Sequence, residues 1–180
     1  MENCPQPVVV DAVEQQGDLL ALTVDDGVDT NVVRMYTQLA KDTGIRLTFF
    51  VNGVYDSWRD NAALLRPLVD SGQIQLGNHT WSHPDLTTLS ADDIKDQLRR
   101  NDQFLRNTYG ADATPYFRPP YGNHNDVVDG IAADMGYRIK LLGVAQMTGR
   151  GLEQRMSPCL VPAESPLGQL QGGTNMVVVE

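Results

Sequence analysis

The sequence predicts an α/β fold in which parallel strands alternate with helices. Short apolar runs of strand length recur along the chain, and segments with apolar residues at helical spacing separate them. Glycine, proline and capping residues mark most of the junctions. Strands joined through helices pair in parallel with right-handed crossovers. We therefore expect the polar clusters that follow the strands to share one edge of the sheet, where α/β barrels carry their active sites.

Each expected strand is a short apolar run bounded by turn residues. The first is continuously apolar, which suits a buried strand, and it runs into the turn signal of Asp25, Asp26 and Gly27. The second is rich in residues that favour strands and closes at Asn52 and Gly53. The five strands are expected at Leu19–Val24, Ile45–Val51, Ile74–Gly77, Pro115–Arg118 and Tyr137–Leu142.

The helices between these strands combine an apolar face with capping residues at their ends. The second, at Asn61–Ser71, contains Pro67, which is expected to weaken or break it. Asp29 or Thr30 and Gly44 mark the ends of the first helix, and Ser90 and Gly110 those of the third. The last helix carries Val127 or Val128 on its apolar face and is expected to end at Gly136.

The regular alternation covers only part of the chain and divides it into three segments. A chain of 180 residues fits one domain better than two. Residues 1–18 form an expected N-terminal approach segment, and residues 19–142 hold the alternation. Residues 143–180 show no period and many glycines and prolines, so we expect an atypical, truncated and poorly ordered tail. Only Met176–Val179 has the composition of a strand, and we expect a sheet edge without a partner.

The composition excludes several classes of partner. A formal net charge of −9 and a sequence pI of about 4.6 disfavour nucleic acids and anionic lipids, which bind basic surfaces. No stretch has the length and apolarity of a membrane span, and residues 1–16 lack the basic and apolar parts of a signal peptide. The two cysteines, Cys4 and Cys159, form no Cys-x-x-Cys pair, and we expect unpaired thiols.

Two of the three histidines, His79 and His83, lie four residues apart and form a candidate metal-binding pair. On one helical turn this spacing points both imidazoles at one point. Asp26, at the end of the first expected strand, is the natural third ligand of a His₂-Asp site with open positions. Surface histidines at this spacing are common, so the pair alone is a weak signal.

The adjacent carboxylates of Asp25 and Asp26 strengthen the metal hypothesis. A turn or a helix cap explains one aspartate well and two less well. Neighbouring carboxylates repel each other unless a cation lies beside them. A metal bound to one of them would also keep the other ionised and ready to act as a base.

The third polar cluster follows the fourth expected strand and runs from Arg118 through two prolines to Tyr121 and Gly122. One interpretation is a rigid loop with a surface arginine. The other is an arginine that pairs with a carboxylate and orients it, held by prolines that keep the loop still.

Three motifs thus occur in order, each after an expected strand: Thr23 to Gly27, His79 to His83, and Arg118 to Gly122. With the intervening pattern from Leu19 to Leu142, they resemble the polysaccharide deacetylases with a NodB-type catalytic domain, carbohydrate esterase family four. The resemblance implies a distorted, incomplete (β/α) barrel and identifies residues 19–142 as a NodB-like deacetylase domain.

The resemblance implies that the chain is a hydrolase that removes acetyl groups from N-acetylated sugars of chitin-like or peptidoglycan-like glycans. Asp26, His79 and His83 would bind a divalent metal ion, usually zinc and sometimes cobalt or another ion. Relatives of this kind are often exported or associated with the cell envelope, while this chain by itself indicates no compartment.

The resemblance also implies catalytic roles outside the metal ligands. Asp25 would be the general base, oriented by Arg118, and the backbone N–H of Tyr121 would help to bind the oxyanion. The family carries two further downstream motifs, one with an Asp and a Trp and one with a general-acid His, and neither is present. After His83 the only histidine is His124, which is expected to be a loop or helix-capping residue.

The absent motifs support an alternative prediction, a truncated or degenerate relative that binds metal and glycan without effective catalysis. A phosphoesterase on a similar barrel is a third hypothesis, with Arg118 as its only cationic support. Trp58, Trp81 and Tyr55 are candidates either for sugar stacking or for core packing.

Overall fold

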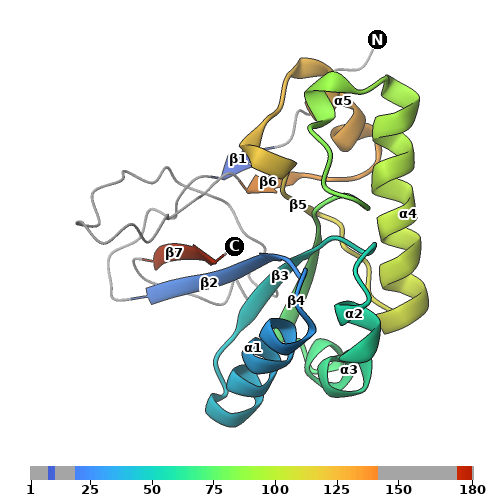
Figure 1. Ribbon diagram of the computed structural model, residues 1–180. Helices are drawn as coiled ribbons and strands as arrows, with labels where there is room; N and C mark the ends of the chain where they lie inside the picture. The colour runs from blue at the N-terminus through green and yellow to red at the C-terminus, as the bar shows by residue number, and fades with distance from the viewer. Residues whose placement is uncertain (1–7, 11–18, 142–173, 180) are drawn as a thin grey trace.

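The strands of the computed structural model form one sheet in the order β1-β6-β5-β4-β3-β2-β7 (Figure 1). The structure describes residues 8–10, 19–141 and 174–179. Every strand pairing is parallel. The strands are β1 (Val8–Val10), β2 (Leu19–Asp26), β3 (Leu47–Val51), β4 (Ile74–Asn78), β5 (Tyr116–Phe117), β6 (Ile139–Leu141) and β7 (Thr174–Val179).

The helices begin and end largely where their capping residues predict. The Asp29 side chain accepts from two N–H groups of the first turn of α1, and Gly44 ends α1 in the left-handed conformation. Ser90 caps α4 and Gly110 ends it. The helices are α1 (Thr30–Thr43), α2 (Ser57–Asp60), α3 (Ala62–Asp70), α4 (Ala91–Tyr109) and α5 (Asp126–Asp134), with 3₁₀ turns η1 (Leu86–Thr88) and η2 (Pro120–Gly122).

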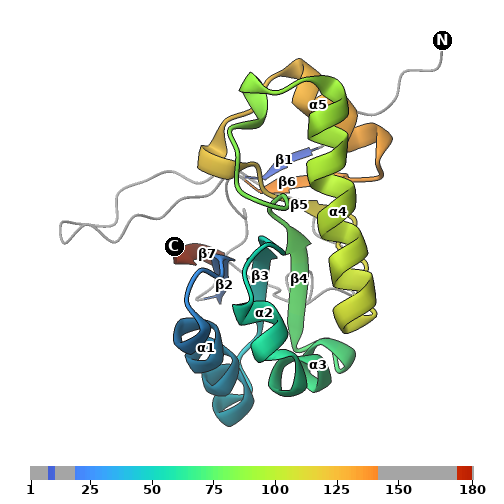
Figure 2. The ribbon, with the colours of Figure 1, turned by 45° about the vertical axis from the view of Figure 1, so that its right-hand side comes forward.

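The strands from β2 to β6 pair with their neighbours in chain order, so the sheet winds in one direction. An α/β barrel winds in this way, whereas a doubly wound sheet reverses its strand order in the middle. Neighbouring helices contact one another, and α3 and α4 also contact β4. Figure 2 shows α1, α3 and α4 around the outside of these strands. Among the described residues no pairing joins β1 to β7, so the barrel is incomplete.

The five expected strands are all present with small shifts of boundary, and one further strand, β1, and one helix, α2, were missed. β1 lies within the expected approach segment and pairs with β6. Helix α2 has only four residues, too few to show a period. Pro67 lies inside α3 without breaking it, which corrects the expectation of a break, since Ser71 N–H still donates to the Pro67 carbonyl.

The tail expected at residues 143–180 is described only over Thr174–Val179, and residues 142–173 lie outside the described ranges. The strand indicated at Met176–Val179 is confirmed as β7, which pairs with β2 along six positions from Leu19–Thr174 to Val24–Val179. β2 is therefore paired on both sides, and the sheet formed by the described residues ends at β1 and β7. The strand-like composition of the segment could not show which strand it would join.

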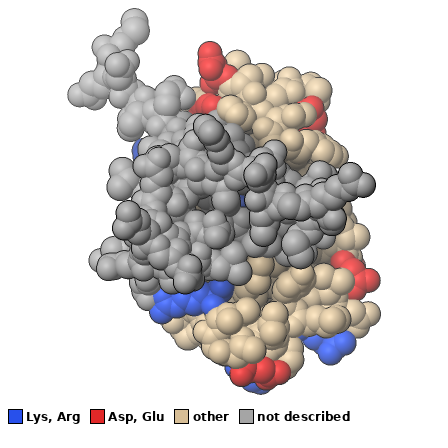
Figure 3. All heavy atoms as spheres, turned by 90° about the vertical axis from the view of Figure 1, so that its left-hand side faces the viewer, with Lys and Arg blue, Asp and Glu red and all other residues tan. Residues whose placement is uncertain are grey.

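The sheet and its helices enclose an apolar core. Members of this core that are almost fully buried include Phe49, Trp58, Leu65, Leu98 and Tyr109. Trp58 meets Phe49 edge to face, with ring centroids 5.3 Å apart. In the space-filling view of Figure 3, the coloured part of the face shows scattered acidic and basic side chains, without a continuous basic surface.

Gly77 leaves room for the Phe50 ring beside β4. A Cβ atom at position 77 would lie 2.5 Å from Phe50 Cε1, and Phe50 is fully buried. Gly77→Ala should therefore lower the free energy of unfolding by about 1–3 kcal/mol through overpacking. Gly130→Ala is the matched control, since nothing lies within 4 Å of that Cβ in α5, and it should stabilise by about 0.4–1 kcal/mol. Urea unfolding measures both, and equal effects at the two sites would contradict this account of the packing.

Candidate metal centre

The register of the parallel strands places the three sequence motifs at one edge of the sheet. Asp26, Val51, Asn78 and Phe117 are successive pairing partners across β2, β3, β4 and β5. The residues that follow each strand therefore meet at its carboxyl end, as expected from the alternation. The same edge carries Asp25, Asp26, His79 and Arg118.

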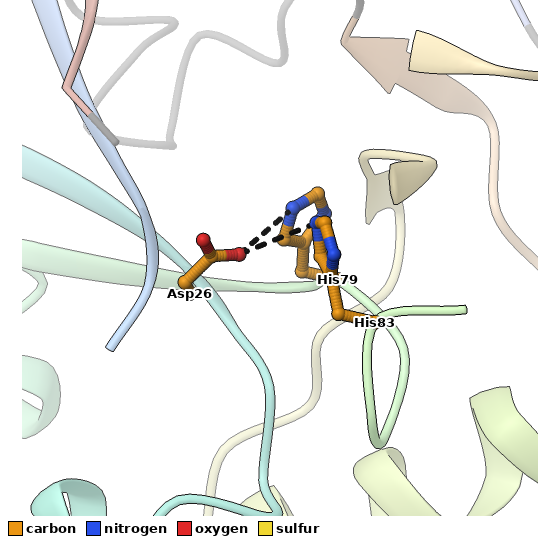
Figure 4. A group of neighbouring side chains, drawn as sticks. All are labelled: Asp26, His79 and His83. Atoms are coloured by element: carbon orange, nitrogen blue, oxygen red, sulfur yellow. Dashed lines mark ion pairs between the residues drawn. The ribbon is translucent and has the colours of Figure 1, made fainter. Parts of the chain in front are cut away.

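Asp26, His79 and His83 converge on a single point (Figure 4). Asp26 Oδ1 lies 3.4 Å from His79 Nε2 and 3.4 Å from His83 Nε2. One ligand atom from each of the three residues lies within 4.8 Å of the others. Two imidazole nitrogens and one carboxylate oxygen match the donor sets that hold a catalytic zinc ion with open positions.

The two histidines converge without the helical turn that the sequence analysis expected. His79 directly follows β4, and His83 lies in the loop beyond it. Thr80 and His83 have φ values of 74° and 59°, in the left-handed region. A loop folded back in this way brings residues four apart together as effectively as a helix would. Four-residue spacing alone does not distinguish the two.

Left-handed backbone conformations gather in the three motifs. Among the described residues, the non-glycine residues with positive φ are Asp26, Thr80, His83 and Tyr121. Such conformations are unfavourable for side chains with a Cβ and persist only where the surrounding structure imposes them. Strained backbone of this kind clusters at functional sites. Its distribution therefore indicates a functional site where the side chains of the three motifs meet.

A hydrogen bond sets the ring orientation of His79. His79 Nδ1 lies 2.7 Å from the carbonyl oxygen of Arg118, which can only accept, so Nδ1 carries the proton. The lone pair of Nε2 then faces Asp26, in the arrangement that metal-binding histidines adopt through an outer hydrogen bond. The backbone of Arg118, in the third motif, thus fixes the ring orientation of His79, in the second motif.

Asp26 carries a buried oxygen atom that lacks a hydrogen-bond donor in the described part of the chain. Its Oδ1 atom is buried and has no hydrogen-bond partner among the described residues. Burial by itself would raise the pKa of Asp26, but the close approach of the His79 and His83 side chains outweighs it and lowers the pKa. A buried carboxylate oxygen without a donor is costly, and a bound cation removes that cost. The residues present therefore fit a divalent metal ion.

Asp25 forms a buried ion pair with Arg118 beside this cluster. Arg118 Nη1 donates to Asp25 Oδ1 at 2.5 Å and to Thr23 Oγ1 at 3.1 Å. The guanidinium carbon also lies 4.3 Å from the centroid of the Phe50 ring. Asp25 Oδ2, the oxygen that Arg118 Nη1 does not hold, lies 3.9 Å from His79 Nε2 and thus faces the histidine pair.

A buried amide network holds the loops that carry the histidines. Asn52 Nδ2 donates to the carbonyls of His79 and Thr80 at 2.5 and 3.0 Å. Asn78 Oδ1 accepts from Thr80 N–H at 2.8 Å and from Asn101 Nδ2 at 2.9 Å. Asn101 also bonds Gly53 N–H and the Val51 carbonyl. Because these groups are buried, each bond lost would leave an unpaired polar atom.

The network continues to an acidic residue that the sequence analysis missed. Asp102 Oδ1 accepts from Tyr137 Oη at 2.5 Å and from Asn78 Nδ2 at 2.9 Å. Asn101 and Asp102 are both buried on α4, although both residue types are ordinarily exposed. Adjacent polar residues near the apolar face of a helix were the only signal in the sequence, and they identify no partner.

Tyr121 lies beside the cluster in a turn. Its φ of 59° lies inside η2, and its ring, which is 67% exposed, meets His83 edge to face with centroids 4.6 Å apart. Asn123 Nδ2 donates to Asp85 Oδ2 at 2.8 Å and ties this turn to the segment after His83. The oxyanion role of the Tyr121 N–H stays a prediction.

The remaining candidates divide between packing and surface positions. Trp58 is fully buried and donates from Nε1 to the Asp26 carbonyl at 3.0 Å, so it packs beneath the site and is no sugar platform. Trp81 and Tyr55 are partly buried against the core. His124 lies 3.1 Å from Asp129 Oδ2, outside the cluster and next to Asn125, which caps α5.

Fold and site together define an α/β protein of the barrel type with a candidate metal centre at the carboxyl edge of its strands. The chain belongs to the polysaccharide deacetylase family, whose model matches residues 12–139. The described part of the chain contains no helix with the length and apolarity of a membrane span.

Several characterised proteins are similar to this chain. The peptidoglycan-N-acetylmuramic acid deacetylase of Bacillus subtilis is 32% identical over 124 residues, which cover 69% of this chain and 46% of that protein. The structure of the chitin deacetylase from Colletotrichum lindemuthianum matches with a TM-score of 0.66 and 33% identity, over 76% of this chain and 60% of the other.

A second similar structure is a mutant of a pseudoenzyme of the same esterase family from Bacillus anthracis, with restored activity. It matches with a TM-score of 0.63 and 27% identity, over 76% of this chain and 48% of the other. The chain spans half or less of the length of the first curated relatives that it matches.

Asp102 gives the amide network a measurable pH dependence. Burial raises the pKa of Asp102 above its ordinary value, although the hydrogen bonds from Tyr137 and Asn78 oppose the rise. The folded chain therefore binds this proton more tightly than the unfolded chain. The stability that the group contributes is complete below the ordinary aspartate pKa and is lost as the pH rises through the folded pKa.

Asp102→Asn should remove this loss, because an amide oxygen still accepts from Tyr137 and does not ionise. The free energy of unfolding of the variant, relative to the parent, should rise with pH and then level off. Urea unfolding between about pH 4 and about pH 8 measures the difference. Asp96→Asn, at an exposed position of the same helix, is the control and should show no such trend. A pH-independent difference for Asp102→Asn would contradict the assignment.

Proposed function

We propose that the chain is a metal-dependent hydrolase that removes acetyl groups from N-acetylated sugars of a chitin-like or peptidoglycan-like glycan. The convergence of Asp26, His79 and His83 beside the Asp25–Arg118 pair carries the proposal. Membership of the polysaccharide deacetylase family supplies the substrate class, and its relatives include deacetylases of chitin and of peptidoglycan.

Asp26, His79 and His83 would hold the metal ion, for which zinc suits the nitrogen and oxygen donors best and cobalt or another divalent ion is an alternative. When bound, such an ion polarises the acetyl carbonyl and lowers the pKa of a bound water. The His79 imidazole presents Nε2 to this position because its Nδ1 is engaged by the Arg118 carbonyl.

Asp25 would accept the proton of the attacking water at Oδ2. Arg118 binds the other oxygen, neutralises the charge and fixes the plane of the carboxylate. Oδ2 lies 3.9 Å from His79 Nε2, which supports a base beside the position proposed for the metal. A general base needs to lie within hydrogen-bond reach of the proton that it takes.

The N–H group of Tyr121 would donate to the oxyanion of the tetrahedral intermediate. Tyr121 has a left-handed backbone conformation within η2, and its ring contacts that of His83. A fixed N–H donor at such a position stabilises developing negative charge without reorganising during the reaction.

A binding protein without effective turnover is the second candidate function, because the chain has no histidine for the general-acid role. The chain has three histidines, of which His79 and His83 belong to the cluster. The third, His124, lies outside the cluster and pairs with Asp129. General acid catalysis contributes about 10²–10⁴-fold, so protonation of the leaving amine from water alone would give slow acetate release. Release of acetate from chitooligosaccharides with added zinc or cobalt separates the two candidates.

The metal proposal predicts that His79→Ala and His83→Ala each weaken zinc binding by at least about a hundredfold, because even outer partners of a metal ligand contribute about 10–100-fold. Isothermal titration calorimetry on the metal-free chain measures the affinity. His124→Ala is the matched control and should bind zinc as the parent does, since His124 lies outside the cluster. Parent-like affinity in the double variant of His79 and His83 would show that the site is misplaced.

The base proposal predicts that Asp25→Asn retains zinc and loses the deacetylation rate that the parent has, by about 10²–10⁴-fold, because an amide cannot accept the proton. Acetate release and zinc content are measured on the same preparation. Loss of zinc together with activity would mean that Asp25 is a ligand and that the roles of the two aspartates are reversed.

A further inference from the structure

A shallow, open cleft outside the candidate metal centre is lined by two arginines that lie over aromatic rings. Its volume is about 420 Å³, within the range of about 300–1,000 Å³ that is common for small-molecule sites. Arg59 comes from α2 and Arg100 from α4, and the Trp81 and Phe104 rings lie beneath them. The lining is completed by the neutral hydrogen-bonding side chains of Gln103, Asn107 and Thr108.

The aromatic rings orient the two guanidinium groups. Arg59 Cζ lies 4.7 Å from the centroid of the Phe104 ring, and Arg100 Cζ lies 4.9 Å from the centroid of the Trp81 ring. A guanidinium over a ring has one face covered, while its N–H donors point outward in its own plane. These donors match the two oxygens of a carboxylate, and holding them in advance reduces the entropy lost on binding.

Each arginine of the cleft also pairs with a nearby aspartate. Arg59 Nη1 lies 3.2 Å from Asp56 Oδ1, and Arg100 Nη1 lies 3.4 Å from Asp96 Oδ2. Both pairs are exposed, so solvent screens them and they contribute little. Among the described residues, neither pair uses the Nε or Nη2 donor of its arginine, and no acidic side chain lines the cleft itself.

We propose that this cleft binds a sugar that carries a carboxylate group. The guanidinium groups of Arg59 and Arg100 would bind the carboxylate, and the amides and hydroxyl of the lining would bind sugar hydroxyls. The cleft shares a loop with the candidate metal centre, because Trp81 lies between His79 and His83. The site is separate from the deacetylation chemistry and holds whether or not the chain releases acetate.

The net charge of −9 does not oppose this assignment. Repulsion between exposed charges is screened over about 8–10 Å at ordinary salt, whereas the two arginines contact the ligand directly. A contact of this kind weakens as salt is added, which gives the interaction a signature that hydroxyl contacts alone would lack.

The experiment titrates the full chain with D-glucuronate and with D-glucose, which lacks only the carboxylate, and follows the backbone amide and indole signals by NMR. The chain is kept metal-free with a chelator, so the carboxylate cannot bind an ion in the other site. Glucuronate should bind saturably and shift the Trp81 indole N–H and the Thr108 amide. Glucose should bind about tenfold more weakly or worse, since charge-assisted hydrogen bonds are lost.

Arg59→Gln and Arg100→Gln should each weaken glucuronate binding by about tenfold. Arg99→Gln, the same charge change at the adjacent exposed position of α4, should leave binding unchanged. Parent-like binding in Arg100→Gln, equal binding of glucose and glucuronate, or no saturable binding would overturn the proposal. Acetate that binds as tightly as glucuronate would overturn the sugar part, because the cleft would then be a simple anion site.

Discussion

The register of four parallel strands is the constraint on which the candidate site depends. Asp26, Val51, Asn78 and Phe117 form one row across the sheet, so each following residue reaches the carboxyl edge at the same level. A slip of one residue in a strand would turn its side chains to the opposite face. This register therefore brings Asp26 close to His79 and allows the Arg118 side chain to reach Asp25.

Buried polar groups hold this edge together because each would be costly without its partner. Asn52, Asn78 and Asn101 use their amides to join the turns after β3 and β4 to α4. Arg118 serves two motifs at once, with its side chain on Asp25 and its carbonyl on His79. Asp26 Oδ1, like Asn52 Oδ1, is a buried oxygen without a donor among the described residues, and a cation beside Asp26 would satisfy it.

Local sequence signals predicted much of the fold and the three motifs of the site. Apolar runs with strong end signals predicted β2 to β6, and the caps at Asp29 and Ser90 predicted helix starts. The joining of β7 to β2 and of β1 to β6 was not predictable, because such pairings depend on distant segments. The roles of Asn101 and Asp102 were missed for the same reason, since their burial becomes apparent only when Asn78 and Tyr137 are placed beside them.

Crystallographic anomalous scattering of the zinc-loaded chain, recorded on both sides of the zinc absorption edge, tests the central claim most directly. The account predicts a single strong peak enclosed by Asp26, His79 and His83, with Asp25 Oδ2 turned toward it. A strong peak at another position, such as the His124–Asp129 pair, or no peak at saturating zinc, would contradict it.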